Sequence, residues 1–143
     1  MHLAQVNVAR AKAAMDDDVM AGFVARVAEI NALADGSPGF VWRLATDAGV
    51  YVRPYDDDRI LFNLSVWQSV EALHDFVYRS THAQLFKQRF DWFDRFERPS
   101  MALWWVAEGH IPSIDEAKQR LADLQAHGPT PAAFTFKQIF PAL

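Results

Sequence analysis

The side chain with the widest chemical range in this sequence is His82, which follows residues 78–81 (Tyr-Arg-Ser-Thr) at a break between two predicted helical segments. An imidazole near the start of a helix can donate or accept a proton near neutral pH, and its neutral nitrogen can ligate a metal. The alternative is a capping or hydrogen-bonded structural histidine. The sequence therefore leaves two roles open for His82, that of a catalytic base or hydrogen-bond donor and that of a structural residue.

Asn7, Arg43 and Asn63 are polar residues inside three predicted strands. The two amides can orient a carbonyl or a hydroxyl group of a ligand, or each can satisfy its neighbour in the sheet. The guanidinium of Arg43 is always charged and binds the oxygens of a carboxylate, phenolate or enolate. Its alternative partner is a carboxylate across a dimer interface. All three are candidates for substrate binding.

Ser65, Trp67 and Trp104 complete the set of substrate-binding candidates. Ser65 and Trp67 follow the alternation of Asn63 along one strand, so these side chains point to the same side of the sheet. Trp104, in the last predicted strand, and Gln5, in the first, are assigned to the same row. Aromatic residues dominate cores and subunit interfaces, so packing is the alternative role for both tryptophans.

Several catalytic and metal-binding motifs are absent from the sequence. It has no Cys and no GxSxG elbow, and its six glycines form neither GxGxxG nor GxxxxGK[ST]. The five histidines show no HxH or HExxH spacing, and the acidic run at residues 56–58 lacks the remaining residues of a calcium loop. We expect no metal site, unless His82 binds a haem, and interpret the acidic run as a solvated turn.

The composition is that of one globular domain. The 143 residues are 51% hydrophobic and 13% aromatic, with 14 Lys and Arg against 18 Asp and Glu. We assign residues 1–112 to an α+β domain and 113–143 to a helix and strap of the same domain. The chain has no basic stripe and no segment typical of a signal or a membrane span, so we expect neither nucleic acid nor membrane as a partner and a cytoplasmic location.

Periodic patterns predict four strands and three helical regions. Strands are expected over residues 3–9, 39–46, 60–67 and 101–107, with Phe40, Trp42 and Leu44 on one side of the second. Helices are expected between residues 16 and 36, over 69–96 with a break near residue 80, and over 114–127 after a capping box. A tail with three prolines follows.

The predicted order of elements is β-α-β-β-α-β-α. It is typical of a ferredoxin-like α+β fold, an antiparallel βαββαβ sheet with helices on one face, here with an extra C-terminal helix and an extended tail. The other face would be bare, and the polar and aromatic row is placed on it. Exposed apolar patches usually mark contacts, so we expect a homodimer, a dimeric α+β barrel whose sheets enclose a cavity for a small molecule.

Six stretches carry a resemblance over nearly the whole chain. They are residues 63–73 (Asn-Leu-Ser-Val-Trp-Gln-Ser-Val-Glu-Ala-Leu), 76–82 (Phe-Val-Tyr-Arg-Ser-Thr-His), 92–93 (Trp-Phe), 103–106 (Leu-Trp-Trp-Val), 109–110 (Gly-His) and 127–136 (His-Gly-Pro-Thr-Pro-Ala-Ala-Phe-Thr-Phe). This sequence closely resembles the DUF3291 family, a bacterial family of uncharacterised function.

A shorter pattern, W-x-S-x-E at residues 67–71 followed by S-x-H at 80–82, is similar to the antibiotic-biosynthesis-monooxygenase group of the dimeric α+β barrel superfamily. That resemblance implies a ferredoxin-like dimer with a pocket between sheet and helices. Some members oxygenate electron-rich aromatics without a cofactor, by holding and deprotonating a substrate that itself reacts with dioxygen. Others degrade haem with an Asn, a Trp and a His at the places that Asn7, Trp67 and His82 occupy here.

Three functions are compatible with these patterns. The favoured one is a monooxygenase-like enzyme that needs no cofactor and acts on an aromatic or polyketide-like compound. The alternatives are a non-catalytic module that binds or senses a small molecule in the same pocket, and a haem-binding or haem-degrading protein.

Overall fold

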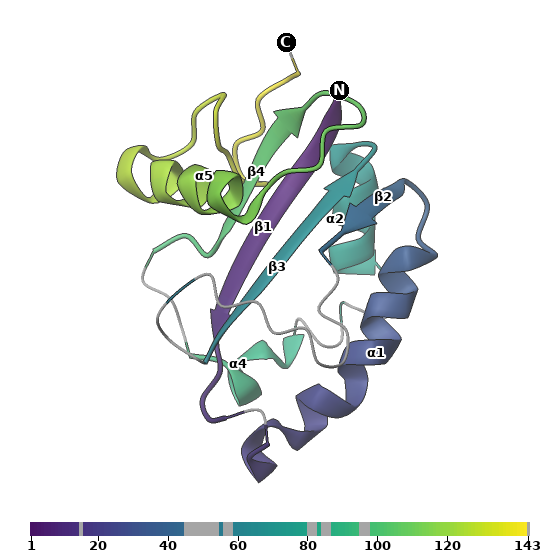
Figure 1. The fold of residues 1–143 in the computed structure, drawn as a ribbon, viewed down its shortest axis with the longest axis vertical. Coiled ribbons are helices and arrows are strands. Elements are labelled where there is room, and N and C mark those ends of the chain that lie inside the picture. Colours follow the sequence, from purple (N-terminus) through teal and green to yellow (C-terminus); the bar gives the residue numbers. More distant parts are fainter. Residues whose placement is uncertain are drawn as a thin grey trace.

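The computed structural model describes residues 1–14, 16–44, 55, 59–79, 83, 87–94 and 98–142. These residues form a four-stranded antiparallel sheet in the order β2-β3-β1-β4 with helices packed around it (Figure 1). The strands are β1 (His2–Arg10), β2 (Phe40–Arg43), β3 (Ile60–Trp67) and β4 (Met101–Val106). The helices are η1 (Asp18–Met20), α1 (Ala21–Asp35), α2 (Val70–Arg79), α4 (Arg89–Trp92) and α5 (Ile114–His127). The predicted ferredoxin-like α+β sheet with an extra C-terminal helix is confirmed.

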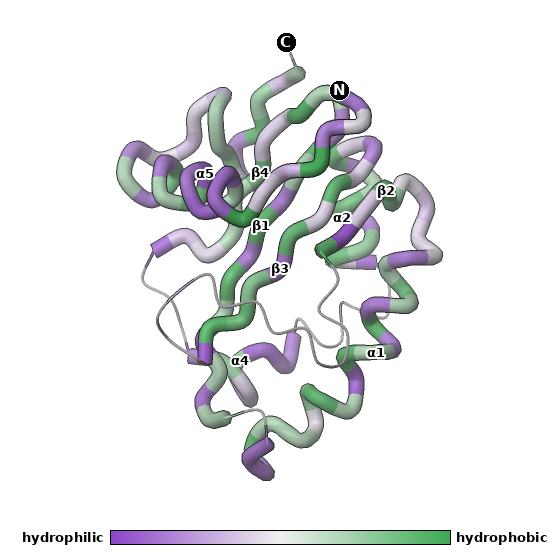
Figure 2. Tube along the Cα trace, in the orientation of Figure 1, coloured by the Kyte–Doolittle hydropathy of each residue, from purple (hydrophilic) through white to green (hydrophobic). Residues whose placement is uncertain are grey.

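The central strand β1 defines the two faces of the sheet. It pairs with β3, where Asn7 lies opposite Asn63, and with β4, where Ala4 lies opposite Trp104. Side chains alternate along a strand, so Asn7 and Ala4 point to opposite faces. This alternation is visible in the hydropathy along β1 (Figure 2). We call the face of Asn7 the α2 face and the face of Ala4 the α5 face, after the helices that cover them.

The α5 face is apolar. α5 begins after Ser113, whose Oγ accepts a hydrogen bond from the backbone N–H of Glu116 at 3.0 Å, and it buries Ala117, Leu121 and Leu124. The strand residues of the same cluster are Ala4, Val6, Val8, Leu64, Val66, Ala102, Trp104 and Val106. An amphipathic helix has to bury its apolar stripe. α5 therefore covers part of the sheet face that the sequence analysis left without a helix.

The α2 face is covered by α2 and by the C-terminal tail. Leu73 and Val77 of α2 pack in one buried cluster with Leu3, Trp67, Leu103 and Phe134. Trp67 belongs to the polar and aromatic row that the sequence analysis placed on a bare face. That placement is wrong, because α2 packs on the face of the sheet that carries Trp67.

Helix α1 is attached to the sheet through its two ends. Near its start, Phe23 packs against Trp92 and Phe93, with ring centroids 5.9 and 4.9 Å apart. Phe93 in turn forms an antiparallel bridge with Ala11, just beyond the end of β1. At its other end, Asp35 pairs with Arg43 of β2. These contacts place α1 and α4 next to the part of the sheet that carries Asn7.

The C-terminal tail covers the outer edge of β4. Phe134 and Leu103 exchange two backbone hydrogen bonds of 2.8 Å each, and the indole of Trp105 donates to the carbonyl oxygen of Phe140 at 2.8 Å. Farther along, Phe136 contacts His74 on α2, with ring centroids 5.4 Å apart. An unpaired edge strand invites pairing with other chains. The tail removes that risk for β4 and ties the edge to α2.

Strand β2 contains an irregularity that changes the side of one residue. The register with β3 shifts between Phe40 and Trp42. Phe40 therefore packs in the cluster of the α2 face, whereas Trp42 and Leu44 pack in that of the α5 face. The prediction that these three residues share one side is wrong, because a bulge adds a residue and reverses the alternation. The last two residues predicted for this strand lie outside the described residues.

Candidate functional site

Four polar residues form a compact group in the middle of the α2 face. Gln5 lies opposite Ser65, and Asn7 lies opposite Asn63 two residues further along β1. Both strands are inner strands of the sheet. Directly opposed residues have Cβ atoms about 4.5–5.5 Å apart. We call Gln5, Asn7, Asn63 and Ser65 the polar quartet.

The buried half of the quartet is a hydrogen-bonded pair. Gln5 and Ser65 are 5% and 6% exposed. The Oγ atom of Ser65 accepts a hydrogen bond from Nε2 of Gln5 at 2.7 Å and another from Nε1 of Trp67 at 2.9 Å. The Trp67 ring packs between Phe40 and Phe76, with centroid distances of 5.5 and 5.2 Å. The structure brings Ser65 and Trp67 together, and it directs the indole N–H to Ser65.

The other half of the quartet is reached by solvent. Asn7 is half-buried and Asn63 is exposed, although both belong to inner strands on a face that α2 and the tail cover elsewhere. Exposure at the centre of a sheet means that the covering layer leaves an opening there. The quartet therefore runs from a fully hydrogen-bonded interior at Ser65 to accessible amide groups at Asn63.

Arg43 borders the quartet from β2, where it lies opposite Ser65. Its guanidinium donates to both carboxylate oxygens of Asp35 at the end of α1, from Nε to Oδ1 at 2.7 Å and from Nη2 to Oδ2 at 3.2 Å. The side chain of Arg43 is 18% exposed and that of Asp35 is 47% exposed. Arg43 thus places a positive charge beside the quartet. It pairs with a carboxylate of the same chain, whereas the sequence had suggested a carboxylate across a dimer interface as one alternative.

The structure does not bring Trp104 to this group. Trp104 is fully buried on the α5 face, and its Nε1 donates to Oε2 of Glu116 at 2.9 Å. The other carboxylate oxygen of Glu116 lies 2.8 Å from Nε2 of His110. Burial raises the pKa of Glu116, but the hydrogen bonds from Trp104 and His110 and the charges of His110 and Arg120 outweigh it, so the pKa lies below its ordinary value.

His82, the catalytic candidate, lies outside the described residues. The helix that leads to it, α2, ends at Arg79. α2 packs on the same face as the quartet, where Phe76 stacks on Trp67. The position of the imidazole relative to the quartet stays a prediction.

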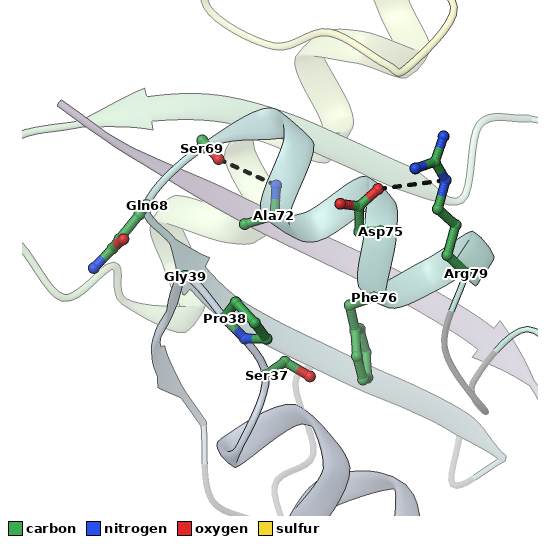
Figure 3. Close-up of a pocket in the computed structure, with 9 residues that line it drawn as sticks. All are labelled: Ser37, Pro38, Gly39, Gln68, Ser69, Ala72, Asp75, Phe76 and Arg79. Atoms are coloured by element: carbon green, nitrogen blue, oxygen red, sulfur yellow. Dashed lines mark hydrogen bonds and ion pairs between the residues drawn. The ribbon is translucent and has the colours of Figure 1, made fainter.

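A separate groove lies beside α2, between this helix and the turn before β2 (Figure 3). It has a volume of about 490 Å³ and is bounded by the turn before β2 and by α2, with Pro38, Gly39, Ala72 and Phe76 as its apolar lining. The two charged residues that line it, Asp75 and Arg79, form an exposed ion pair of 3.6 Å. The groove contains none of the predicted site residues, and the Phe76 ring separates it from Trp67.

Two residues of the site were missed by the choice of candidates from the sequence. Gln5 was placed in the row but not among the binding residues, although its position opposite Ser65 makes it the partner of that hydroxyl. Asp35 gave no signal, because a carboxylate near a helix end is usually solvated. Only the packing of α1 beside β2 brings it to Arg43.

Metal and membrane sites were searched for over the described ranges. Among those residues, no three His, Asp or Glu side chains come together as ligands of a metal ion. No helix in this part of the chain is both long and apolar enough to cross a lipid bilayer.

The fold and the quartet define a class, that of ferredoxin-like α+β proteins with polar side chains on the helix-covered face of the sheet. Within that class, the chain belongs to the family described as "Domain of unknown function (DUF3291)", whose model matches residues 2–143. A search of curated proteins finds no match.

Two similar solved structures have the same fold. One is SnoaB, a cofactor-independent oxygenase from Streptomyces nogalater, with 19% sequence identity, a TM-score of 0.53, and coverage of 78% of this chain and 98% of that chain. The other is a single-site variant of the same protein, with 18% identity, a TM-score of 0.53 and the same coverage. At this identity the likeness shows a shared fold and no more.

Proposed function

We propose that this protein is a small-molecule enzyme of the cofactor-independent oxygenase type, which acts on an electron-rich aromatic or polyketide-like compound. The observation that carries the proposal is the polar quartet, whose accessible amides Asn7 and Asn63 continue into a buried hydrogen-bonded pair. Apolar surroundings with a few convergent polar groups are typical of small-molecule sites. The fold shared with SnoaB supports the same class of reaction.

Each residue of the site has a distinct role in this proposal. Asn7 and Asn63 orient oxygen atoms of the substrate, and Arg43 supplies positive charge at the β2 side. His82 removes a proton, which leaves a substrate anion that transfers electrons to dioxygen. The protein's contribution is then to hold the substrate, to stabilise the anion and to accept the proton. Trp67 forms part of the wall, and Trp104 has no role because it lies on the other face.

The test is oxygen consumption with a panel of hydroxylated naphthalenes and anthrones in the presence of a metal chelator. We expect uptake with the wild-type protein and a loss of about 10²–10⁴-fold in His82→Ala, the range for removal of a general base. Asn63→Ala should lose activity as well. His127→Ala, an exposed histidine at the end of α5, is the matched control and should retain it. Absence of uptake with every compound contradicts the oxygenase proposal.

Other outcomes of the same preparation identify the alternative functions. Saturable binding of a panel compound without oxygen uptake identifies a binding or sensing module. A Soret band in the purified protein identifies a haem protein, for which Trp67 is poorly placed because it is buried and its N–H is bound to Ser65.

We also propose that the protein is a homodimer, joined through the β2 and β3 side of the α5 face. Support comes from half-buried apolar residues on β2 and β3, among them Trp42, Ile60 and Phe62, whereas the sheet contacts of α5 are with β4 and β1. Sedimentation velocity should give the mass of two chains for the wild type and of one for Phe62→Glu. Val24→Glu, at an exposed position of α1, is the control. A monomeric wild type contradicts the proposal.

A further inference from the structure

The hydroxyl of Ser65 can act only as a donor toward a ligand. A serine oxygen has two lone pairs and one proton. Both lone pairs are occupied, by Nε2 of Gln5 at 2.7 Å and by Nε1 of Trp67 at 2.9 Å. The indole N–H can only donate, so the direction of the hydrogen bond between Trp67 and Ser65 cannot be reversed. Ser65 therefore has only its hydroxyl proton left for a further hydrogen bond.

The directions of the two donors determine where that proton lies. Gln5 reaches the oxygen from β1, and Trp67 reaches it from two residues further along β3. The remaining position of the oxygen's tetrahedron faces away from both donors. In the described part of the chain no residue accepts a hydrogen bond from this hydroxyl. The proton is therefore available to a ligand on the α2 face.

The neighbouring side chains of this face can all donate hydrogen bonds, Arg43 as a donor only and the two asparagines through amides that can also accept. Asn7 and Asn63 carry amide N–H groups, and Arg43 on β2 lies opposite Ser65. The carboxylate of Asp35 is held by Arg43 through two hydrogen bonds. A set of N–H and O–H donors beside a guanidinium suits an oxygen atom that carries negative charge.

We propose that the Ser65 hydroxyl donates a hydrogen bond to an ionised oxygen of the bound compound, a phenolate or an enolate. Gln5 is the positioning residue that fixes this role. The proposal rests on the proposed function, because it names the ionised form that the α2 face binds. Gln5 acts through Ser65, by occupying a lone pair that would otherwise be free to accept a hydrogen bond from a neutral phenol.

The test is equilibrium binding of 4-nitrophenol under anaerobic conditions, followed by the visible absorbance of its phenolate. 4-Nitroanisole, the methyl ether of this probe, cannot ionise and serves as the reference ligand. We expect the wild type to prefer the phenolate to the ether and to lower the apparent pKa of the bound probe. Ser65→Ala should reduce this preference by about ten-fold or more, because it removes a hydrogen bond to a charged group. Ser65→Thr, which keeps the hydroxyl, should restore it.

The variants of Gln5 separate positioning from packing. In Gln5→Glu the introduced carboxylate accepts the hydrogen bond that the Ser65 hydroxyl would otherwise donate to the ligand, so the preference for the phenolate should be lost. Gln5→Met has similar volume and no charge, and it should lose part of the preference. Gln119→Glu adds the same charge at an exposed position of α5 and should leave the preference unchanged. The indole N–H resonance of Trp67 shows whether each variant is folded.

Three results would overturn this proposal. They are no binding of the phenolate to the wild type, equal affinity for phenolate and ether, and an unchanged preference in folded Ser65→Ala. Each is distinct from failure of the oxygenase proposal, since the measurement needs no dioxygen. Oxygen uptake without phenolate preference removes only the role of Ser65 and Gln5, and phenolate preference without uptake leaves their role intact in a binding module.

Discussion

The indole nitrogen of Trp104 lies 2.9 Å from Oε2 of Glu116 and donates a hydrogen bond to it. Trp104 is fully buried, and Glu116 belongs to the first turn of α5. The second oxygen of the carboxylate is bound by His110 in the loop that leads to the helix. One side chain thus joins β4, the loop and α5, and it holds the helix on the sheet.

Removing this carboxylate should destabilise the protein. Glu116→Ala leaves the buried N–H of Trp104 without an acceptor, which costs about 1–3 kcal/mol. Glu116→Gln retains an acceptor oxygen and should cost less. Urea unfolding of the two variants measures the difference. Equal stability of Glu116→Ala and the wild type would show that Trp104 finds another acceptor.

The same residue predicts a loss of stability in acid. Burial raises the pKa of Glu116, but the hydrogen bonds from Trp104 and His110 and the charges of His110 and Arg120 lower it further, to below the ordinary value of 4.5. The unfolded state then binds the proton more readily than the folded state, so the free energy of unfolding falls as the pH falls below about 4.5. Glu116→Gln should show a flatter acid limb in pH-dependent melts. Parallel limbs would contradict the prediction.

Gly39 should tolerate no side chain. Its φ is +82°, and a Cβ atom built there lies 2.5 Å from Cβ of Ala72 on α2. Gly109 has a similar φ of +87° with nothing within 4 Å of such an atom, so it serves as the matched control. Both Gly→Ala variants incur the backbone strain, about 1–3 kcal/mol, and Gly39→Ala should lose more because α2 must also shift. Thermal melts that rank the two variants in the opposite order would refute the close approach.

The tail should contribute strongly to stability. Phe134 is fully buried against both β4 and α2, so Phe134→Ala is expected to cost about 3–5 kcal/mol. Ile139→Ala, at a 47% exposed position of the same tail, should be nearly neutral. Removal of residues 129–143 should also expose the edge of β4 and promote aggregation. An unchanged melting temperature of the truncated protein would mean that the tail does not contribute to the stability of the fold.

The Asp35–Arg43 pair should modulate the binding of anions. Asp35→Asn removes the negative charge 2.7 Å from Nε of Arg43, so the affinity for 4-nitrophenolate should rise about two- to five-fold. Asp75→Asn alters a comparable exposed ion pair on α2 and should have no effect. Stability should change by at most about 1 kcal/mol in either variant. An unchanged or lower affinity in Asp35→Asn would show that Arg43 does not interact with the bound anion.

The local elements of this fold follow from the sequence with little ambiguity. The third strand was predicted over residues 60–67 and is observed as Ile60–Trp67, and the last helix begins after its predicted cap and ends at His127. Alternation also assigned Asn63, Ser65 and Trp67 to one side of β3. The period of a strand is a property of the backbone and needs no tertiary contact. The bulge at Phe40 was missed because a one-residue insertion has no signature in hydrophobicity.

What the sequence alone determined is which residues of one strand share a side, together with the order of the elements and the apolar stripe of α5. Only the tertiary structure decided which side each helix covers. It placed the polar row on the face that α2 partly covers, separated Trp104 from that row through the register of β4 with β1, and paired Arg43 with Asp35. The physical reason is that alternation is symmetric: it distinguishes two faces of a strand but does not say which of them the helices bury, since that choice depends on contacts between residues far apart in the chain.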